Sequence, residues 1–217
     1  MVGVGPGSPS YLTRKAQEVL EGSDIIAGFQ HSLNTVEKLL AGKEVIVIKY
    51  KQQAEILKKI GEASNGKICS FTCTGDPDFS DSEYIRRLTQ IYGSVEIIPG
   101  VSSIQVAAAR FGFPIDKSRV LSFHITGDIE AQKAALLKSV RSQQPVILLP
   151  RPWDFMPDKI SQFLIENGVQ ESTVCGVCEK LTLPEEAIFR GTLKDTLTRE
   201  FSDLSVVLIG DGELSVR

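Results

Sequence analysis

Residues 1–28, MVGVGPGSPSYLTRKAQEVLEGSDIIAG, contain the local signals that predict the fold. A short apolar segment, residues 1–5, ends in the loop GPGSPS, and apolar residues then recur at helical spacing between positions 12 and 20. A second short apolar segment follows at residues 24–27. A strand, a helix and another strand in this order are typical of a parallel sheet that is covered by helices.

The same alternation continues along the chain, and it predicts two α/β domains. In the first half we expect further strands at 44–48, 67–73 and 95–98, of which 44–48 (EVIVI) is predicted to be buried, and an apolar helix at 102–112. The segment FGFPIDKSR at 111–119 combines glycine, proline and charge, so we place the domain boundary there, between domains 1–113 and 119–217.

The second half predicts a mixed sheet. Apolar runs at 120–125, 145–149 and 205–209 are expected to be strands, and a helix is expected at about 129–142. Two extended segments follow one another at 172–179 and 186–190, which is typical of a hairpin. An antiparallel hairpin beside βα units makes the predicted sheet mixed rather than purely parallel.

Composition and charge narrow the class of protein. The chain has 217 residues, of which 42% are hydrophobic and 24% are charged, as in ordinary globular proteins. A net charge of −3 predicts no bulk attraction to nucleic acid or to an anionic membrane. No apolar run approaches the roughly 20 residues that span a bilayer, and residues 1–9 lack the pattern of a signal peptide. We therefore expect a cytoplasmic protein.

The four cysteines, Cys69, Cys73, Cys175 and Cys178, lie in or beside strand-like runs. The pair at 175 and 178 has the spacing of zinc and redox motifs. In an extended strand, however, a separation of three places the two thiols on opposite faces. The two histidines do not have metal-ligand spacing. We expect buried structural thiols and no metal site.

Three glycine-bearing loops follow predicted strands, at residues 3–7, 74–77 and 99–103. An ordinary turn or a helix cap would explain each loop alone. Together they fall at the carboxyl ends of strands in one sheet, where open α/β sheets bind ligands, so we expect them to meet around a small molecule. A dinucleotide fingerprint would require glycine where Ser8 stands, which disfavours a nicotinamide oxidoreductase.

The ordered motifs resemble a known family. VGVGPGSPSYLTRKAQEVLEGSDIIAG, TCTGDPDF, IIPGVSSIQVAAARFGFP and VCEKLTLPEEAIFRGTLKDT are similar, in order and spacing, to the tetrapyrrole (corrin/porphyrin) methylases. Within that family, AARFGFPIDKSRVLSFH resembles the (cobalt-)precorrin-7 (C-5)-methyltransferases of cobalamin biosynthesis. The segment RPW after Pro150 is not matched to the family pattern, and DFSDS stands where many members have a glycine-rich continuation after the G-D-P loop.

The resemblance implies two α/β domains with a cofactor cleft between them, usually in a homodimer. It also implies S-adenosylmethionine as the cofactor and a tetrapyrrole as the substrate, with methylation at C-5 of a (cobalt-)precorrin. Two alternatives stay open at this point. One is another methylase of the family, of the uroporphyrinogen-III or diphthine synthase type. The other is a nucleotide-binding module without catalytic activity.

Family positions also imply site residues. The residues that match cofactor contacts are Pro6, Thr74, Gly75, Asp76, Ser102, Ser103, Leu149, Val177 and Ser205. The candidates for the substrate, which carries many carboxylates, are Arg14, Arg110, His124, Arg151 and Lys180. The sulfonium methyl is already activated, so the enzyme mainly aligns carbon, methyl and sulfur and excludes water. We identify no catalytic triad, although His124 is a candidate for proton removal.

Overall fold

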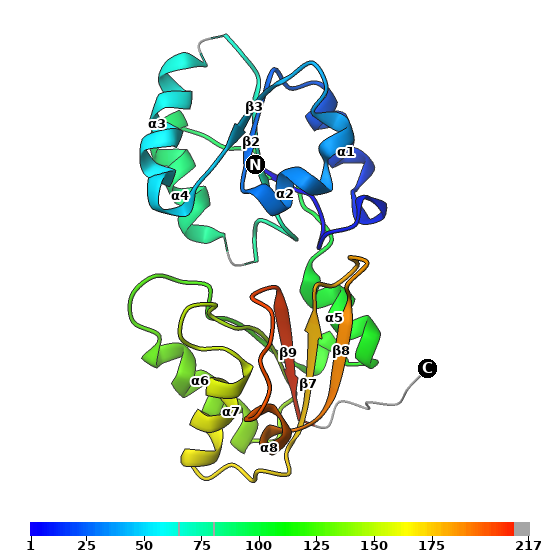
Figure 1. The fold of residues 1–217 in the computed structure, drawn as a ribbon. Helices are drawn as coiled ribbons and strands as arrows, with labels where there is room; N and C mark the ends of the chain where they lie inside the picture. The colour runs from blue at the N-terminus through cyan, green and yellow to red at the C-terminus, as the bar shows by residue number, and fades with distance from the viewer. Residues whose placement is uncertain (65, 80, 211–217) are drawn as a thin grey trace. The chain divides into compact units, whose positions relative to one another are not determined.

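The computed structural model describes residues 1–64, 66–79 and 81–210, and it divides the chain into two compact units (Figure 1). Unit 1 is Met1–Ser102, and unit 2 begins at Ser103. Each unit contains its own sheet and its own apolar core. The prediction of two α/β domains is therefore confirmed.

Unit 1 contains a four-stranded parallel sheet in the order β1-β4-β2-β3. Its strands are β1 (Val2–Gly3), β2 (Ile25–Gly28), β3 (Glu44–Val47) and β4 (Cys69–Cys73). The strand expected at 95–98 is reduced to one parallel bridge, between Val2 and Ile98. All four strands run in the same direction, so the loops that follow them lie at one edge of the sheet.

Helices cover both faces of this sheet (Figure 1). They are α1 (Arg14–Glu21), α2 (Gln30–Thr35), α3 (Gln53–Ala63) and α4 (Ser82–Tyr92). Leu20 of α1 and Leu33 of α2 belong to one buried cluster, whereas Leu57 of α3 and Leu88 of α4 belong to another. A parallel sheet that is covered by helices on both faces needs a separate apolar cluster on each face.

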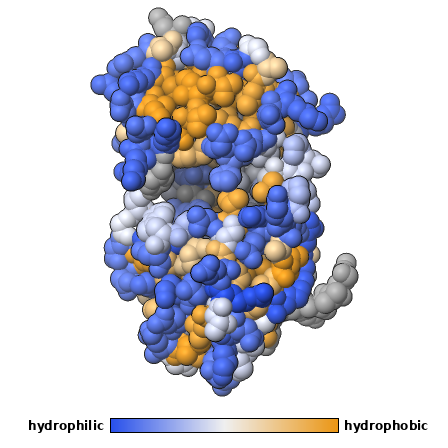
Figure 2. Space-filling model, in the orientation of Figure 1, coloured by the Kyte–Doolittle hydropathy of each residue, from blue (hydrophilic) through white to orange (hydrophobic). Residues whose placement is uncertain are grey.

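The strand β3 corrects one prediction. Residues 44–48 were expected to be buried, but Val45 and Val47 are 39% and 42% exposed because β3 is an edge strand. The backbone N–H groups of Glu44 and Ile48 donate to Asp24 and Gly28, which leaves the hydrogen-bonding groups of the alternate residues directed away from β2. Figure 2 shows an apolar area on the surface of unit 1.

Unit 2 contains a five-stranded sheet in the order β5-β6-β9-β7-β8. Its strands are β5 (Arg119–Ser122), β6 (Val146–Leu149), β7 (Val174–Glu179), β8 (Ala187–Thr192) and β9 (Ser205–Ile209). The pair β5–β6 is parallel and the three other pairs are antiparallel, so the predicted hairpin and mixed sheet are confirmed. The carboxyl ends of β5, β6 and β7 and the amino end of β9 therefore lie at one edge.

The helices of unit 2 are α5 (Ser103–Phe111), α6 (Glu130–Arg141), α7 (Pro157–Glu166) and the short α8 (Leu193–Thr196). The sequence placed α5 in a first domain, 1–113, but in the structure it packs against β6 and β9 of unit 2. A side chain at Gly176 of β7 would lie 2.2 Å from the ring of Phe111. This close approach explains why the division falls before α5 rather than after it.

The cysteines are buried or half-buried free thiols. Cys175 packs in the main core of unit 2, whereas Cys178 shares the side of β7 that Gly176 presents to α5. Burial raises the pKa of both thiols to about 12. The two side chains on β7 therefore lie on opposite faces, as the spacing predicts, and stay protonated at neutral pH. No helix in the part of the chain that the structure describes is long and apolar enough to cross a membrane.

Candidate functional site

The three glycine-bearing loops of unit 1 meet at the carboxyl ends of its strands, as the sequence predicts. Gly5 and Gly75 form an antiparallel bridge, in which the Gly75 N–H donates to the Gly5 carbonyl at 2.8 Å. The Asp76 carboxylate accepts a hydrogen bond from the Gly100 N–H at 2.9 Å. These bonds tie the loops at 3–7, 74–77 and 99–102 into one structure, which we call the glycine-loop site.

The contact between these loops depends on the absence of side chains. An ideal Cβ at Gly3 would lie 2.7 Å from the Gly100 nitrogen and 2.7 Å from the Gly75 carbonyl oxygen. An ideal Cβ at Gly100 would lie only 2.2 Å from the same Gly75 oxygen. Both clashes are with backbone, which cannot rotate away. The positions of Gly3 and Gly100 therefore admit only glycine without a rearrangement of the loops.

Asp76 braces the site. Its Oδ2 accepts from Gly100, and its Oδ1 accepts from the Asp78 N–H at 2.9 Å. A carboxylate that accepts backbone N–H groups makes stronger hydrogen bonds than a neutral acceptor does. The sequence predicted a direct contact of Asp76 with the cofactor, which stays a prediction. The structure adds that this side chain also fixes the backbone of the neighbouring loop.

The other predicted cofactor contacts of the first half lie close by in the chain. Pro6 is buried, Thr74 is exposed, and Ser102 is 9% exposed. Ser103 is the first residue of α5 and belongs to unit 2. Backbone amides and hydroxyl groups at the ends of parallel strands suit the amino-acid and ribose groups of a small cofactor. The donor set of this site is compatible with S-adenosylmethionine.

Asp81 is an ionisable residue near the glycine-loop site that the sequence did not single out. It precedes α4, just beyond the G-D-P loop, and burial raises its pKa to about 6, with a further contribution from the charge of Asp76. The hydroxyl of the buried Tyr84 has no hydrogen-bond partner among the described residues. The only sequence signal was the acidic segment DFSDS, which carries no information about burial.

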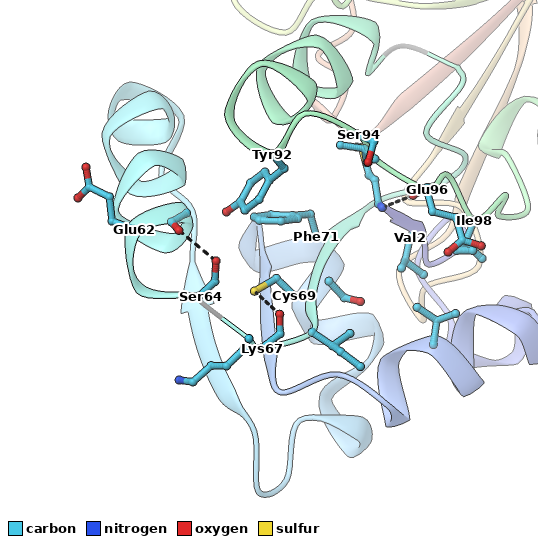
Figure 3. A pocket seen from close by; sticks show the side chains of 17 residues that line it. Val2, Glu62, Ser64, Lys67, Cys69, Phe71, Tyr92, Ser94, Glu96 and Ile98 are labelled. Atoms are coloured by element: carbon cyan, nitrogen blue, oxygen red, sulfur yellow. Dashed lines mark hydrogen bonds between the residues drawn. The ribbon is translucent and has the colours of Figure 1, made fainter.

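Unit 1 also has a hollow that is separate from the glycine-loop site. It has a volume of about 670 Å³, and its lining includes Val2 and Cys69, at the amino ends of β1 and β4, and Tyr92, the last residue of α4 (Figure 3). Burial raises the pKa of the Cys69 thiol, and its Sγ lies 3.9 Å from the Lys67 carbonyl oxygen. Ligands of open α/β sheets bind at the opposite, carboxyl ends, so we do not assign this hollow to the cofactor.

The cofactor candidates of the second half lie on three strands of unit 2. Leu149 ends β6, Ser205 begins β9, and Val177 lies inside β7, where it pairs with Val207. Ser205 pairs with Glu179, the last residue of β7. Leu149, Val177 and Ser205 are 8%, 0% and 4% exposed, and Val177 is paired with Phe189 on one side and with Val207 on the other. Leu149 and Ser205 share one edge of the sheet, whereas Val177 lies deeper.

His124 lies just beyond the carboxyl end of β5, at the same edge of the sheet. Burial lowers its pKa, against the opposing effect of a hydrogen bond with the backbone of Pro150. Its Nε2 is buried and has no hydrogen-bond partner among the described residues. A neutral imidazole with an unpaired ring nitrogen has the protonation state that a proton acceptor needs.

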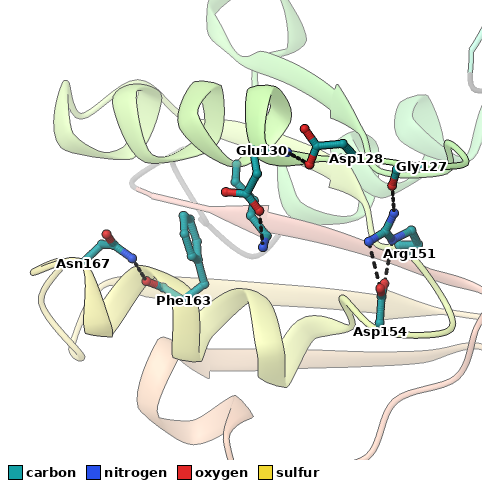
Figure 4. Close-up of polar contacts among 8 residues, drawn as sticks. Gly127, Asp128, Glu130, Arg151, Asp154, Phe163 and Asn167 are labelled. Carbon is teal, nitrogen blue, oxygen red and sulfur yellow. Dashed lines mark hydrogen bonds and ion pairs between the residues drawn. The ribbon is translucent and has the colours of Figure 1, made fainter.

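Two of the arginines expected to bind substrate carboxylates already pair with acidic residues. Arg151 donates to Asp154 through Nε at 2.6 Å and through a terminal nitrogen at 2.8 Å, and also to the Gly127 carbonyl at 2.8 Å (Figure 4). Arg110 pairs with Glu186 at 2.7 Å and holds the pKa of that carboxyl below its ordinary value. We therefore expect both guanidinium groups to support loops more than to bind substrate.

Arg14 and Lys180 differ in their surroundings. Arg14 is exposed on the first turn of α1 in unit 1. Lys180 follows β7, and its backbone has a left-handed φ of 48°. Thr182, two residues later, has a φ of 67° and donates its N–H to Glu186 at 2.6 Å. Non-glycine residues in this conformation are uncommon, so the carboxyl end of β7 is a strained turn.

Comparisons with known proteins identify the family. The family model of the Tetrapyrrole (Corrin/Porphyrin) Methylases matches residues 1–197. A probable cobalt-precorrin-7 C(5)-methyltransferase from Methanocaldococcus jannaschii is 31% identical over 99% of this chain and 99% of its own. A cobalt-precorrin-4 C(11)-methyltransferase of the same organism is 31% identical over 90% of this chain and 78% of its own.

Solved structures share the fold. A precorrin-6Y methylase from Archaeoglobus fulgidus has a TM-score of 0.70 and 23% identity, and the match covers 96% of this chain and 95% of the other. A cobalt precorrin-4 methyltransferase has a TM-score of 0.73 and 22% identity, with 96% and 93% of the two chains covered. From the family match over most of its length, we conclude that the chain belongs to the tetrapyrrole (corrin/porphyrin) methylases.

Proposed function

We propose that this protein is an S-adenosylmethionine-dependent C-methyltransferase that methylates C-5 of a (cobalt-)precorrin in cobalamin biosynthesis. The observation that carries the proposal is the similarity, over 99% of both chains, to a relative described as a probable cobalt-precorrin-7 C(5)-methyltransferase. The glycine-loop site supports it, because Gly3, Gly75 and Gly100 pack backbone against backbone at the edge where such folds bind ligands.

The cofactor would supply the methyl group as an activated sulfonium electrophile. We assign its binding in unit 1 to the loops that contain Pro6, Thr74 to Asp76, and Ser102. In unit 2 we assign it to Ser103, Leu149, Val177 and Ser205. Asp76 keeps two of the loops in place through Gly100, so the backbone groups that meet the ligand are already oriented.

The substrate carries carboxylates, and its bridge carbon is the nucleophile. The carbon–methyl bond forms as the methyl–sulfur bond breaks, with the electron pair staying on sulfur. One proton then leaves the macrocycle. Within unit 2, the neutral His124 has the protonation state of an acceptor for that proton. Lys180 is a candidate contact for a carboxylate. A cytoplasmic homodimer completes the proposal.

The decisive experiment is to incubate the purified protein with a precorrin that lacks the C-5 methyl group and with methyl-labelled S-adenosylmethionine. We expect a product that carries one added label, which carbon NMR places at C-5. Label at C-11 or C-17 would assign the protein to another branch of the family. Transfer to uroporphyrinogen III instead would replace the precorrin assignment. Absence of S-adenosylhomocysteine binding by calorimetry at millimolar concentration would contradict the whole proposal.

A further inference from the structure

Trp153 is an exposed aromatic residue that the proposed function does not yet use. It is the only tryptophan in the sequence, and 57% of its surface is exposed. It lies in the segment RPW, which directly follows Pro150 at the carboxyl end of β6. A tryptophan that keeps this much surface in water leaves unburied one of the largest apolar areas that a side chain has.

The loop that carries Trp153 is rigidly built. Arg151 and Phe155 form an antiparallel bridge, with N–H to O distances of 3.1 and 3.0 Å in the two directions. Phe155 is 4% exposed and belongs to the main core of unit 2, where its ring centroid lies 4.8 Å from that of Phe123. Both ends of the turn are therefore fixed, and Trp153 lies between them.

A buried cation supports the indole from within the protein. The Arg151 guanidinium carbon lies 5.5 Å from the centroid of the Trp153 ring, and Arg151 is 8% exposed. The bonds from Arg151 to Asp154 and to the Gly127 carbonyl fix the guanidinium plane (Figure 4). An indole placed beside a fixed cation loses little rotational freedom when a ligand covers it, which favours binding.

The position of the loop indicates which ligand would cover it. Trp153 comes four residues after Leu149, the last residue of β6, at the edge of unit 2 that also carries His124 and Ser205. We propose that Trp153 is a stacking platform for the conjugated face of the tetrapyrrole substrate. This inference rests on the proposed function, and it adds to it a specificity-determining residue for the substrate.

The adenine ring of the cofactor is the competing occupant, and the burial of the residues argues against it. The cofactor candidates Leu149, Val177 and Ser205 are at most 8% exposed, so they belong to the buried part of the sheet, whereas Trp153 is 57% exposed. A macrocycle of four pyrroles is much larger than adenine, so it can cover the exposed indole while its reacting carbon lies elsewhere.

The test uses calorimetry on the full-length protein with two probes, cobyrinic acid for the macrocycle and S-adenosylhomocysteine for the cofactor. Trp153→Ala should weaken cobyrinic acid binding by about five- to tenfold, which is the size expected for the loss of one aromatic stacking contact. Its affinity for S-adenosylhomocysteine should stay within about twofold of wild type. Trp153→Phe should recover most of the lost affinity, since it restores an aromatic face.

Ile188→Ala is the matched control, because Ile188 is also a large, exposed apolar residue of unit 2, 40% exposed on β8. It should change neither affinity. Unchanged cobyrinic acid binding by Trp153→Ala overturns the inference, and so does an absence of binding by the wild type. Equal weakening of both probes assigns the platform to the cofactor instead. Methyl transfer by the wild type is measured on the same preparation, so failure of the platform and failure of the proposed function are distinguishable.

Discussion

Gly100→Ala should disrupt the glycine-loop site more than any other single methyl group added there. The new Cβ would lie 2.2 Å from the Gly75 carbonyl oxygen and 2.7 Å from the Gly3 carbonyl carbon, so the loops must separate. Their separation lengthens or breaks the 2.9 Å hydrogen bond from Gly100 to Asp76. Overpacking costs about 1–3 kcal/mol, and a hydrogen bond to a charged group contributes about 1.5–3 kcal/mol. We therefore expect a loss of about 3–5 kcal/mol in the free energy of unfolding.

The assay is guanidinium unfolding followed by circular dichroism, together with calorimetric binding of S-adenosylhomocysteine. Gly22→Ala is the matched control. Gly22 has a φ of −79°, and its ideal Cβ would make only ordinary contacts, at 3.6 Å from the nearest atom. The free energy of unfolding of Gly22→Ala should therefore stay within about 1 kcal/mol of the wild-type value. If Gly100→Ala kept both wild-type stability and wild-type affinity, the close packing of the three loops would not matter, and the reasoning would be wrong.

Two further predictions concern buried ionisable groups. Burial raises the folded-state pKa of Asp81 from 3.8 to about 6, so the stability that its protonated form contributes is lost as the pH rises through about 6. Asp81→Asn should therefore stabilise the protein by up to about 3 kcal/mol at pH 7.5 and by little near pH 4. If the variant and the wild type had the same unfolding curve at pH 7.5 as well as at pH 4, the burial of this carboxyl would be contradicted. Ellman's reagent should label only Cys69 in the native protein, because Cys73, Cys175 and Cys178 are buried and their pKa values are raised. Peptide mapping of the labelled protein checks this, and rapid labelling of Cys175 would show that the core of unit 2 opens readily.

The convergence of the three glycine loops could be predicted from the sequence, because parallel strands bring their carboxyl ends together whatever the side chains are. The exposure of β3 could not. A run such as EVIVI is apolar on both faces, which is typical of a central strand, and only the strand order shows that Val45 and Val47 lie at an edge. The expected strand at 95–98 became a single bridge, since only Ile98 reaches β1 closely enough to pair.

The roles of charged residues were the hardest to predict. Arg110 and Arg151 have the chemistry that binds carboxylates, but the protein supplies its own carboxylates from Glu186 and Asp154. Glu186 is distant from Arg110 in the sequence, so only the fold reveals the pair. Asp154 is three residues after Arg151 and offered a local clue. The bracing role of Asp76 depends on the path of a loop that begins more than twenty residues later.

The position of β9 in its sheet has a consequence for the biosynthesis of the protein. The sheet of unit 1 is complete once β4 (Cys69–Cys73) has been made. In unit 2, by contrast, β9 (Ser205–Ile209) lies in the centre of the sheet, between β6 and β7. The ribosome must therefore release the chain through residue 209 before the second sheet can close. Until then, β6 and β7 each have one edge of unpaired backbone N–H and C=O groups beside apolar side chains, which makes the nascent second unit the part most dependent on chaperones.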